Sequence, residues 1–275
     1  MITLIGLGNS ASKIVENLKE NEQYKIITID SGKEIKEYSS PEEYEKNCPS
    51  FKKLFKGVTN EVYLFLSASG KISGSSLRIL EQLKGKKLNV VCFCGDSITL
   101  SAMGILQQNL VTGVLQEYAR SGLLESLILI DSSKIEDLLG DVSLDKYYDK
   151  MNDTISYLFH TFMYFDNAKP VFELGTIEKS LNNIKTWSII DNNGQQKKLF
   201  DLKNETNELF YFSYNKEKNK NKNFLKDVKR FIQTQKEEKK IGAKIFETTS
   251  EDTNTYSVMS THIVQSYKDS DSRNS

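Results

Sequence analysis

With 275 residues, 38% of them hydrophobic and 10% aromatic, the chain is long enough to bury one large core or two smaller ones. Its 37 Lys and Arg balance 37 Asp and Glu, so no global basic field points to nucleic acid or to a membrane surface as a partner. An odd, sparse set of three cysteines indicates a reducing compartment, and without a signal peptide or a long apolar run we expect a soluble cytoplasmic protein.

The first predicted strand, residues 2–5, ends in Gly6-Leu7-Gly8-Asn9-Ser10-Ala11 and is followed by a helix with an apolar face. A second strand, Tyr24–Ile29, ends at Asp30. Strand, Gly-x-Gly-x-x-Ala and helix form the pattern of a dinucleotide phosphate loop, in which an acid about 20 residues past the glycines suits a ribose hydroxyl. The alternative is a tight turn that binds no ligand.

A second Gly/Ser loop follows the third predicted strand, Val62–Leu66, which comes after a polar stretch at residues 31–60 that is interpreted as a loop or short helix. The loop reads Ser-Ala-Ser-Gly-Lys-Ile-Ser-Gly-Ser-Ser over residues 67–76, and a helical run, Leu77–Leu83, comes next. Small residues let backbone N–H groups approach a phosphate, so Gly70 and Gly74 are expected to need close backbone approach or a positive φ. The loop is not a Walker A motif, and a connecting loop whose serines cap a helix is the alternative.

The alternation of strands and helices predicts an α/β fold, a doubly wound parallel sheet of Rossmann-like type over residues 1–170. The further elements of this half are a strand at 88–94, a helix at 101–120, a strand at 127–130, a short helix at 134–139 and a helix at 144–165. In the long helix, the apolar residues fall close to helical spacing: Met103, Leu106, Leu110, Val114 and Tyr118.

A change of composition predicts a second, smaller α+β domain over residues 171–267 and a disordered tail at 268–275. Its expected strands are 184–190, 209–214, 243–249 and 256–264, with one helix at about 223–235. The Lys-, Asn- and Glu-rich stretch 215–223 is interpreted as a solvated hairpin loop rather than a nucleic-acid patch.

The two Gly/Ser loops end the first and third strands, so they are expected to converge on one crevice of a parallel sheet. Tyr148 and Asn152 lie one helical turn apart and share a face. An aromatic ring can stack on a purine, and an Asn amide offers one acceptor and two donors that match the Watson–Crick edge of guanine. An amphipathic helix with exposed polar residues is the alternative.

Residues 1–165 resemble the tubulin/FtsZ superfamily, with the similar segments in the right order. Residues 6–13 are similar to the family's first nucleotide loop, and residues 69–75 are similar to a degenerate form of its GGGTGTG signature. Residues 119–123 with 127–132 are similar to the segment "AxxGI…LIxIPN". Tyr148-x-x-x-Asn152-Asp153 is similar to the start of the central helix. A divergent branch, of phage or plasmid type, is one interpretation.

The resemblance implies that the protein binds GTP or GDP, with Mg²⁺ as a companion ion, and assembles head to tail into filaments. It assigns the nucleotide to Gly6, Gly8, Asn9, Ser10, Ser69, Gly70, Lys71, Ser73, Gly74, Ser132, Tyr148 and Asn152, with no metal-ligating residue. Asp166 is the one acid after the central helix that suits catalysis on a neighbouring subunit. Val111 and Leu115 stand where the family has a Glu and an Arg for the ribose, so hydrolysis is expected to be slow or absent.

Two other functions remain open at this point. One is a degenerate tubulin-like structural or interaction protein that binds no nucleotide. The other is an NAD-dependent oxidoreductase, which the first glycine loop and Asp30 favour. No catalytic constellation supports the oxidoreductase: the only histidines are His160 and His262, and His160 sits in an aromatic helix, which favours packing over catalysis.

Overall fold

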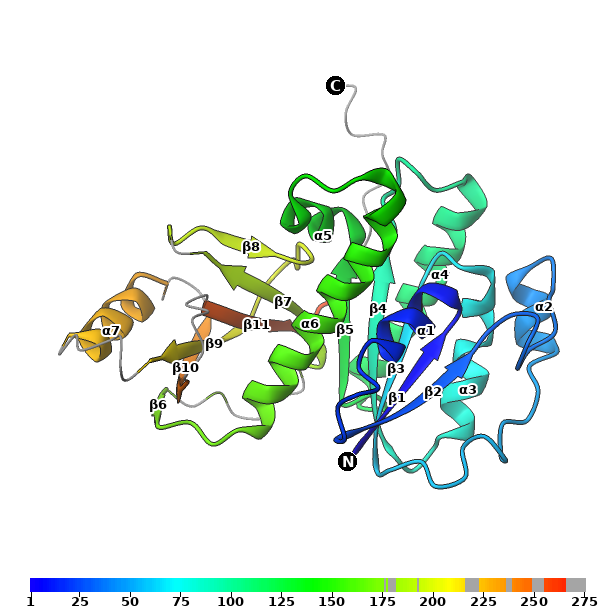
Figure 1. The fold of residues 1–275 in the computed structure, drawn as a ribbon, viewed down its shortest axis with the longest axis horizontal. Helices are drawn as coiled ribbons and strands as arrows, with labels where there is room; N and C mark the ends of the chain where they lie inside the picture. The colour runs from blue at the N-terminus through cyan, green and yellow to red at the C-terminus, as the bar shows by residue number, and fades with distance from the viewer. Residues whose placement is uncertain are drawn as a thin grey trace.

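The computed structural model describes residues 1–175, 177, 182–191, 193–215, 223–235, 239–248 and 255–265. Its strands form one mixed, 11-stranded sheet in the order β2-β1-β3-β4-β5-β7-β11-β9-β10-β6, with β8 paired to β7. The predicted α/β class and the smaller α+β part are therefore confirmed (Figure 1). The predicted tail, 268–275, and residues 216–222 of the predicted hairpin loop lie outside the described residues.

Five parallel strands build the N-terminal half, and all five were expected from their apolar runs. They are β1 (Ile2–Leu7), β2 (Tyr24–Ile29), β3 (Glu61–Ser67), β4 (Lys87–Cys94) and β5 (Ser126–Asp131). In β3 and β4 nearly every residue is buried, as in a strand that is covered on both faces.

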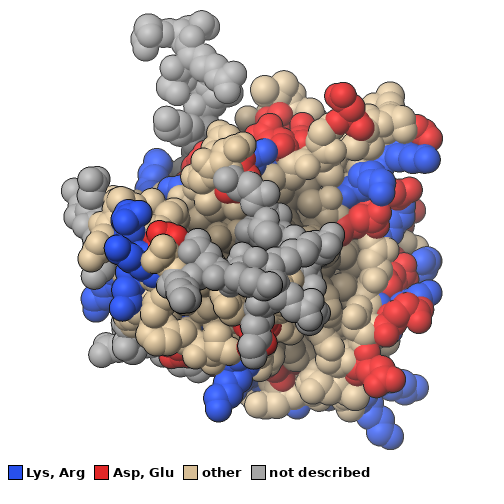
Figure 2. All heavy atoms as spheres, turned by 60° about the vertical axis from the view of Figure 1, so that its left-hand side comes forward, with Lys and Arg blue, Asp and Glu red and all other residues tan. Residues whose placement is uncertain are grey.

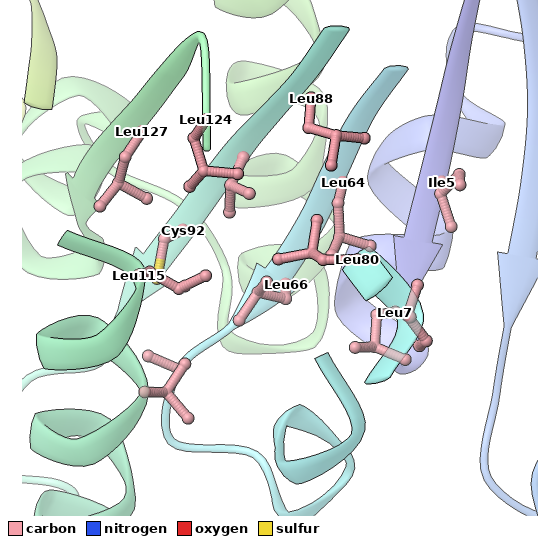
Figure 3. Packing of buried hydrophobic residues seen from close by; sticks show 14 of the residues in the cluster. Ile5, Leu7, Leu64, Leu66, Leu80, Leu88, Cys92, Leu115, Leu124 and Leu127 are labelled. Atoms are coloured by element: carbon pink, nitrogen blue, oxygen red, sulfur yellow. The ribbon is translucent and has the colours of Figure 1, made fainter. Parts of the chain in front are cut away.

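Helices cover both faces of these strands. One face carries α1 (Asn9–Glu16), α5 (Ser132–Leu139) and α6 (Tyr147–Asn167), which share a core with Leu4 and Phe65. The other face carries α2 (Pro41–Lys46), α3 (Ser76–Gln82) and α4 (Ala102–Arg120), with the short 3-10 helix η1 (Lys71–Ser75) between β3 and α3. Figure 3 shows how leucines of the strands and of α3 and α4 fill this second core.

The C-terminal half extends the same sheet. Its elements are β6 (Phe172–Leu174), β7 (Ile184–Ile190), β8 (Gln196–Lys198), β9 (Asn207–Tyr214), α7 (Phe224–Gln235), β10 (Lys240–Glu247) and β11 (Thr255–Thr261). Strand β7 pairs in parallel with β5, which makes the sheet continuous between the halves. The short strands β6 and β8 were not predicted, because three residues carry too little pattern. The boundary at residue 170 stays a prediction.

Helix α6 crosses the junction between the halves and holds them through aromatic packing. Phe162 stacks on Trp187 of β7 with ring centroids 4.7 Å apart, and Phe165 stacks on Tyr211 of β9 at 5.1 Å. Such rings bury large apolar areas and add stacking energy, so α6 and the C-terminal sheet are fixed to each other. In the described part of the chain no helix is long and apolar enough to cross a membrane.

Helix α4 forms where it was predicted, but its apolar face points to solvent. Met103, Leu106 and Leu110 are 62%, 52% and 54% exposed, and Val114 continues the same row. Helical spacing identifies residues that share a face, but it does not say which face meets the sheet. The exposure of this apolar row could therefore not be predicted from the helical periodicity alone.

The buried face of α4 is rich in glutamine. Gln107 donates to the Ser73 hydroxyl at 3.0 Å, and Gln108 accepts from the Gly95 amide at 2.7 Å. Gln116 is fully buried and bonds to backbone near the end of the described chain. Buried polar groups need such partners, so α4 turns inward the side chains that hold loops in place.

Candidate functional site

The two Gly/Ser loops lie at the C-terminal ends of β1 and β3. Gly8 has a φ of 86° and begins α1, a conformation that favours glycine. The first amides of a helix have no partner within it, so those of Asn9 and Ser10 face outward at this edge and favour an anion. Gly6 has a different role, since a Cβ there would lie 2.6 Å from the Ser12 Cα and would separate β1 from α1.

The predicted convergence of the loops is present in the structure. A Cβ on Gly8 would lie 2.9 Å from the Ile72 Cγ2, so the second loop packs directly against the first. Beside this contact is a cavity of about 430 Å³. Its lining consists of Gly8, Asn9, Asp30, Ser31, Lys33, Glu37, Tyr38, Tyr44, Lys71 and Ile72. Lys71 is exposed and adds a positive charge to the helix-start amides.

Asp30 lies in this cavity, next to the first glycine loop as its position after β2 suggested. Its carboxylate accepts from the Ser12 hydroxyl at 2.8 Å and is 3.5 Å from the Lys33 ammonium. The acid is therefore already paired within the chain. A ribose hydroxyl there would have to share it.

The start of α6 is joined to the first loop. The Ser10 hydroxyl donates to the Asn152 Oδ1 at 3.1 Å, and Asn152 is 6% exposed. Tyr148, one turn earlier, is 74% exposed, and its ring lies nearly perpendicular to that of Tyr147. The structure thus brings Asn152 to the first loop and leaves the Tyr148 ring open to solvent, where a flat ligand can stack.

The second loop is bonded mainly to itself. The Ser73 hydroxyl is buried and lies 3.0 Å from the Ala68 carbonyl and 2.6 Å from the Gly70 carbonyl. The Ser75 hydroxyl donates to the Ile72 carbonyl at 2.7 Å, and that of Ser69 lies 3.4 Å from Ser67. Ser73 thus holds the loop and does not point outward to a ligand.

Of the two glycines of this loop, Gly70 differs from what was expected and Gly74 agrees with it. Gly70 has a φ of −73°, so it does not need left-handed backbone. Gly74 does need close approach, because a Cβ there would lie 2.1 Å from the Pro41 carbonyl oxygen. The close neighbour is the start of α2, however, and not open space for a phosphate.

Ser132 begins α5 behind Asp131. The Asp131 carboxylate accepts from the Ser133 amide at 2.9 Å and from its hydroxyl at 2.8 Å, which caps the helix. A negative charge therefore already occupies this helix start. Ser132 itself is partly exposed at the edge where β5 ends.

Asp166 lies at the other end of α6, far along the helix from Asn152. It lines a second cleft of about 430 Å³ where β3, β4 and β5 begin. Its residue surface is exposed, yet its carboxylate accepts from the buried Tyr211 hydroxyl at 2.8 Å. Although the residue keeps exposed surface, desolvation of its carboxylate beside Tyr211 raises the pKa of Asp166, against the lowering effect of the Tyr211 hydrogen bond, Lys185 and Lys244.

We expect the Asp166→Asn variant to be at least as stable as the wild-type chain at neutral pH. A raised pKa means that the folded state binds the proton more tightly than the unfolded chain, so this group's contribution to stability falls as pH rises above 3.8 through the folded pKa. Asn keeps an acceptor for Tyr211 and has no charge to desolvate. Urea unfolding between pH 4 and 7 should show a stability difference that grows with pH in favour of the variant, while a difference independent of pH would contradict this assignment.

Sequence reasoning missed several residues that shape the site. Tyr38 and Tyr44 line the first cavity, and Gln107 holds Ser73 from α4. Because residues 31–60 are mostly polar, they were interpreted as a loop, and the two tyrosines were not expected to line a site. The apolar spacing of α4 gave no indication that its glutamines face inward. Among the described residues, no three His, Cys, Asp or Glu side chains gather to hold a metal ion.

No protein-family model and no curated protein sequence matches this chain. Solved structures do match. FtsZ from M. jannaschii, solved as an empty dimer, superposes with a TM-score of 0.70 at 12% identity, covering 94% of this chain and 88% of that one. The chain has the tubulin/FtsZ fold. The predicted resemblance is thereby confirmed at the level of the fold.

Two further solved structures share the tubulin/FtsZ fold with this chain. CetZ from Methanosaeta thermophila gives a TM-score of 0.67 at 12% identity, covering 95% of this chain and 86% of that one. TubZ from Bacillus thuringiensis serovar israelensis, solved as a GTPγS-form protofilament, gives 0.66 at 14% identity, covering 94% and 86%. These identities are low, so the comparison establishes the fold alone.

Proposed function

We propose that this protein binds a guanine nucleotide where β1 and β3 end, and that it assembles head to tail. The observation that carries the proposal is the joining of three separate segments at one edge, through the Gly8–Ile72 contact and the Ser10–Asn152 hydrogen bond. TubZ with the same fold is found as GTPγS-form and GDP-form protofilaments, which supports both halves of the proposal.

The residues present fit a nucleotide in the following way. The amides at the start of α1 and the Lys71 ammonium suit the phosphates, and the open ring of Tyr148 suits the base. Asn152 keeps its amide donors for a guanine carbonyl while its oxygen accepts from Ser10. With no cluster of carboxylates among the described residues, Mg²⁺ would depend on the phosphates for most of its ligands.

We also propose that GTP hydrolysis is slow and depends on protein concentration. Asp166, which lies in the last turn of α6 and not after it, is the acid that would act on a neighbour's phosphate, but its carboxylate is bonded to Tyr211 inside its own chain. We expect Asp166→Asn to abolish turnover and to leave GTP binding unchanged. The cytoplasmic location inferred from the cysteines is part of the same proposal.

A structural or interaction protein without nucleotide is the second candidate. Ile72 lies over Gly8, and the serines of the second loop bond to their own backbone carbonyls. Both features reduce the polar surface that a phosphate would need.

Thermal melts with GTP, GDP, ATP and NAD separate these functions, because a ligand that binds the native state raises the melting temperature. We expect GTP and GDP to give clear shifts and ATP and NAD to give smaller ones. Equal shifts with ATP would remove the guanine assignment, and a shift with NAD alone would favour the oxidoreductase. No shift with any of the four would leave the structural protein.

Tyr148→Ala should weaken every purine nucleotide by about 1 to 3 kcal/mol, the usual contribution of one stacked base. Because the side chain is 74% exposed, the variant should fold as the wild-type chain does. Tyr148→Phe keeps the ring and serves as the control, with affinity expected to stay close to wild type.

Asn152→Ala should instead reduce the preference for guanine over adenine by about 1 kcal/mol. Competition titrations measure both effects, and unchanged affinity in Tyr148→Ala would exclude stacking.

A further inference from the structure

A groove between α2, α3 and α4, here called the α4 groove, has an apolar floor and a carboxylate rim. Its volume is about 220 Å³, and its lining includes Leu77, Leu110 and Val114, with Glu42 and Glu45 on the α2 side. The exposed apolar row of α4 continues from it toward Met103. An exposed apolar row with a polar rim is typical of a protein-binding surface.

The rim of the α4 groove is negatively charged. Its two acidic side chains are Glu42 and Glu45 of α2. Bonds from its own amide and from Ser40 lower the pKa of Glu42, so this side chain stays ionised. Among the described residues Glu42 makes no ion pair, and the Glu45 carboxylate forms an ion pair with the Arg78 guanidinium at 3.6 Å. The rim therefore favours a cationic partner.

Helix α7 presents the opposite charge. It buries Val228 and Ile232 against the C-terminal sheet and exposes Lys226 and Lys229 on its outer face. Within the described part of the chain neither lysine has an ion-pair partner, whereas Arg230 pairs with Asp227 at 3.7 Å. Helix α7 itself contains three Lys and Arg against one Asp. Figure 2, with the α7 end turned forward, shows Lys and Arg gathered at the left of the molecule.

The two surfaces lie at opposite ends of the molecule. Along the longest axis in Figure 1, α7 occupies one end, and α2, α3 and α4 occupy the other. A contact between opposite ends is heterologous, and such contacts build open chains of subunits when the rotation between neighbours does not close a ring. The lengths also agree, since α7 and the exposed row of α4 from Met103 to Val114 each comprise twelve residues, about 18 Å of helix.

We infer that the α4 groove receives α7 of a second copy of this chain, with Lys226 and Lys229 directed to Glu42 and Glu45. The lysine stems would cover the apolar floor while their ammonium groups reach the rim. This inference rests on the proposed head-to-tail assembly and names the surfaces that carry it.

Charge reversal tests the inference by sedimentation velocity with GTP present. The variants are Lys226→Glu/Lys229→Glu and Glu42→Lys/Glu45→Lys, and the matched control is Lys52→Glu/Lys53→Glu, two exposed lysines outside both surfaces. Each test variant alone should associate at least tenfold more weakly than the wild-type chain, and the control should associate normally. An equimolar mixture of the two test variants should recover assembly, because each then meets a partner of opposite charge at both ends.

Normal assembly by either test variant, or a mixture that stays monomeric, would overturn the inference. A wild-type chain that stays monomeric would overturn it as well. The GTP melt of the same samples separates the two claims. If GTP still raises the melting temperature while assembly does not follow the charges, nucleotide binding holds and only the docking inference is wrong. If GTP does not raise the melting temperature of the wild-type chain, the proposed nucleotide binding is itself wrong.

Discussion

Replacing Gly74 by Val is expected to destabilise the protein by about 3 kcal/mol or more. The new Cβ would lie 2.1 Å from the Pro41 carbonyl oxygen, a backbone atom that cannot rotate away. Overpacking of this kind usually costs about 1 to 3 kcal/mol, and more when backbone has to shift. Urea unfolding measures the loss.

Gly113→Ala is the matched control for this variant. Gly113 lies within α4 and has no atom within 4 Å of the position of a new Cβ, so Ala there should stabilise the helix by up to about 1 kcal/mol. Equal stability of Gly74→Val and the wild-type chain would show that the contact between the second loop and α2 is not tight. The clean probe of phosphate approach is Gly70→Ala, since a Cβ at Gly70 would lie 3.5 Å from the Ser67 oxygen, an ordinary contact.

Replacing Glu208 by Ala is expected to cost about 1 to 3 kcal/mol, the usual loss when buried hydrogen-bond donors are left without their acceptor. Glu208 is fully buried in β9 and pairs with the Lys239 ammonium, which also pairs with Glu205 at 3.0 Å and so stays compensated in the variant. Its other oxygen accepts from Gln196 at 2.6 Å and from Ser257 at 2.7 Å. The substitution leaves these groups without their shared acceptor.

Glu81→Ala is the control, because Glu81 is exposed and its ion pair with Arg78 at 3.3 Å should contribute about 0 to 0.5 kcal/mol. Denaturant unfolding compares the two variants. Similar stability of both would show that the charges around Glu208 contribute no more than a surface pair does.

The strands and the order of the elements could be predicted because buried parallel strands have continuous apolar runs. The stretch Leu88–Cys94 shows this, since all of its residues are buried in β4. Helix α4 shows the limit of the same reasoning. Its residues repeat at helical spacing, but the side that meets the sheet is decided by bonds to Ser73 and Gly95, which are distant in sequence.

Some residues of the candidate site could likewise be predicted from local sequence, whereas contacts between distant segments could not. Gly8 and Asn152 could be named from local pattern, because a positive-φ helix start and a residue one turn into α6 depend on near neighbours. Gly74 was named for a phosphate, yet its close neighbour is Pro41 of α2. That contact and the Asp166–Tyr211 bond join residues 33 and 45 positions apart, which no local pattern reports.

Isothermal titration calorimetry with GDP tests the central claim most directly. We expect one site per chain, with GDP bound at least about tenfold more tightly than ADP, a difference of about 1.4 kcal/mol in binding free energy. Gly70→Ala should weaken this binding if the second loop approaches the phosphates, while the fold is retained. Binding of GDP and ADP with equal affinity, or the absence of binding at millimolar GDP to the folded wild-type chain, would contradict the account.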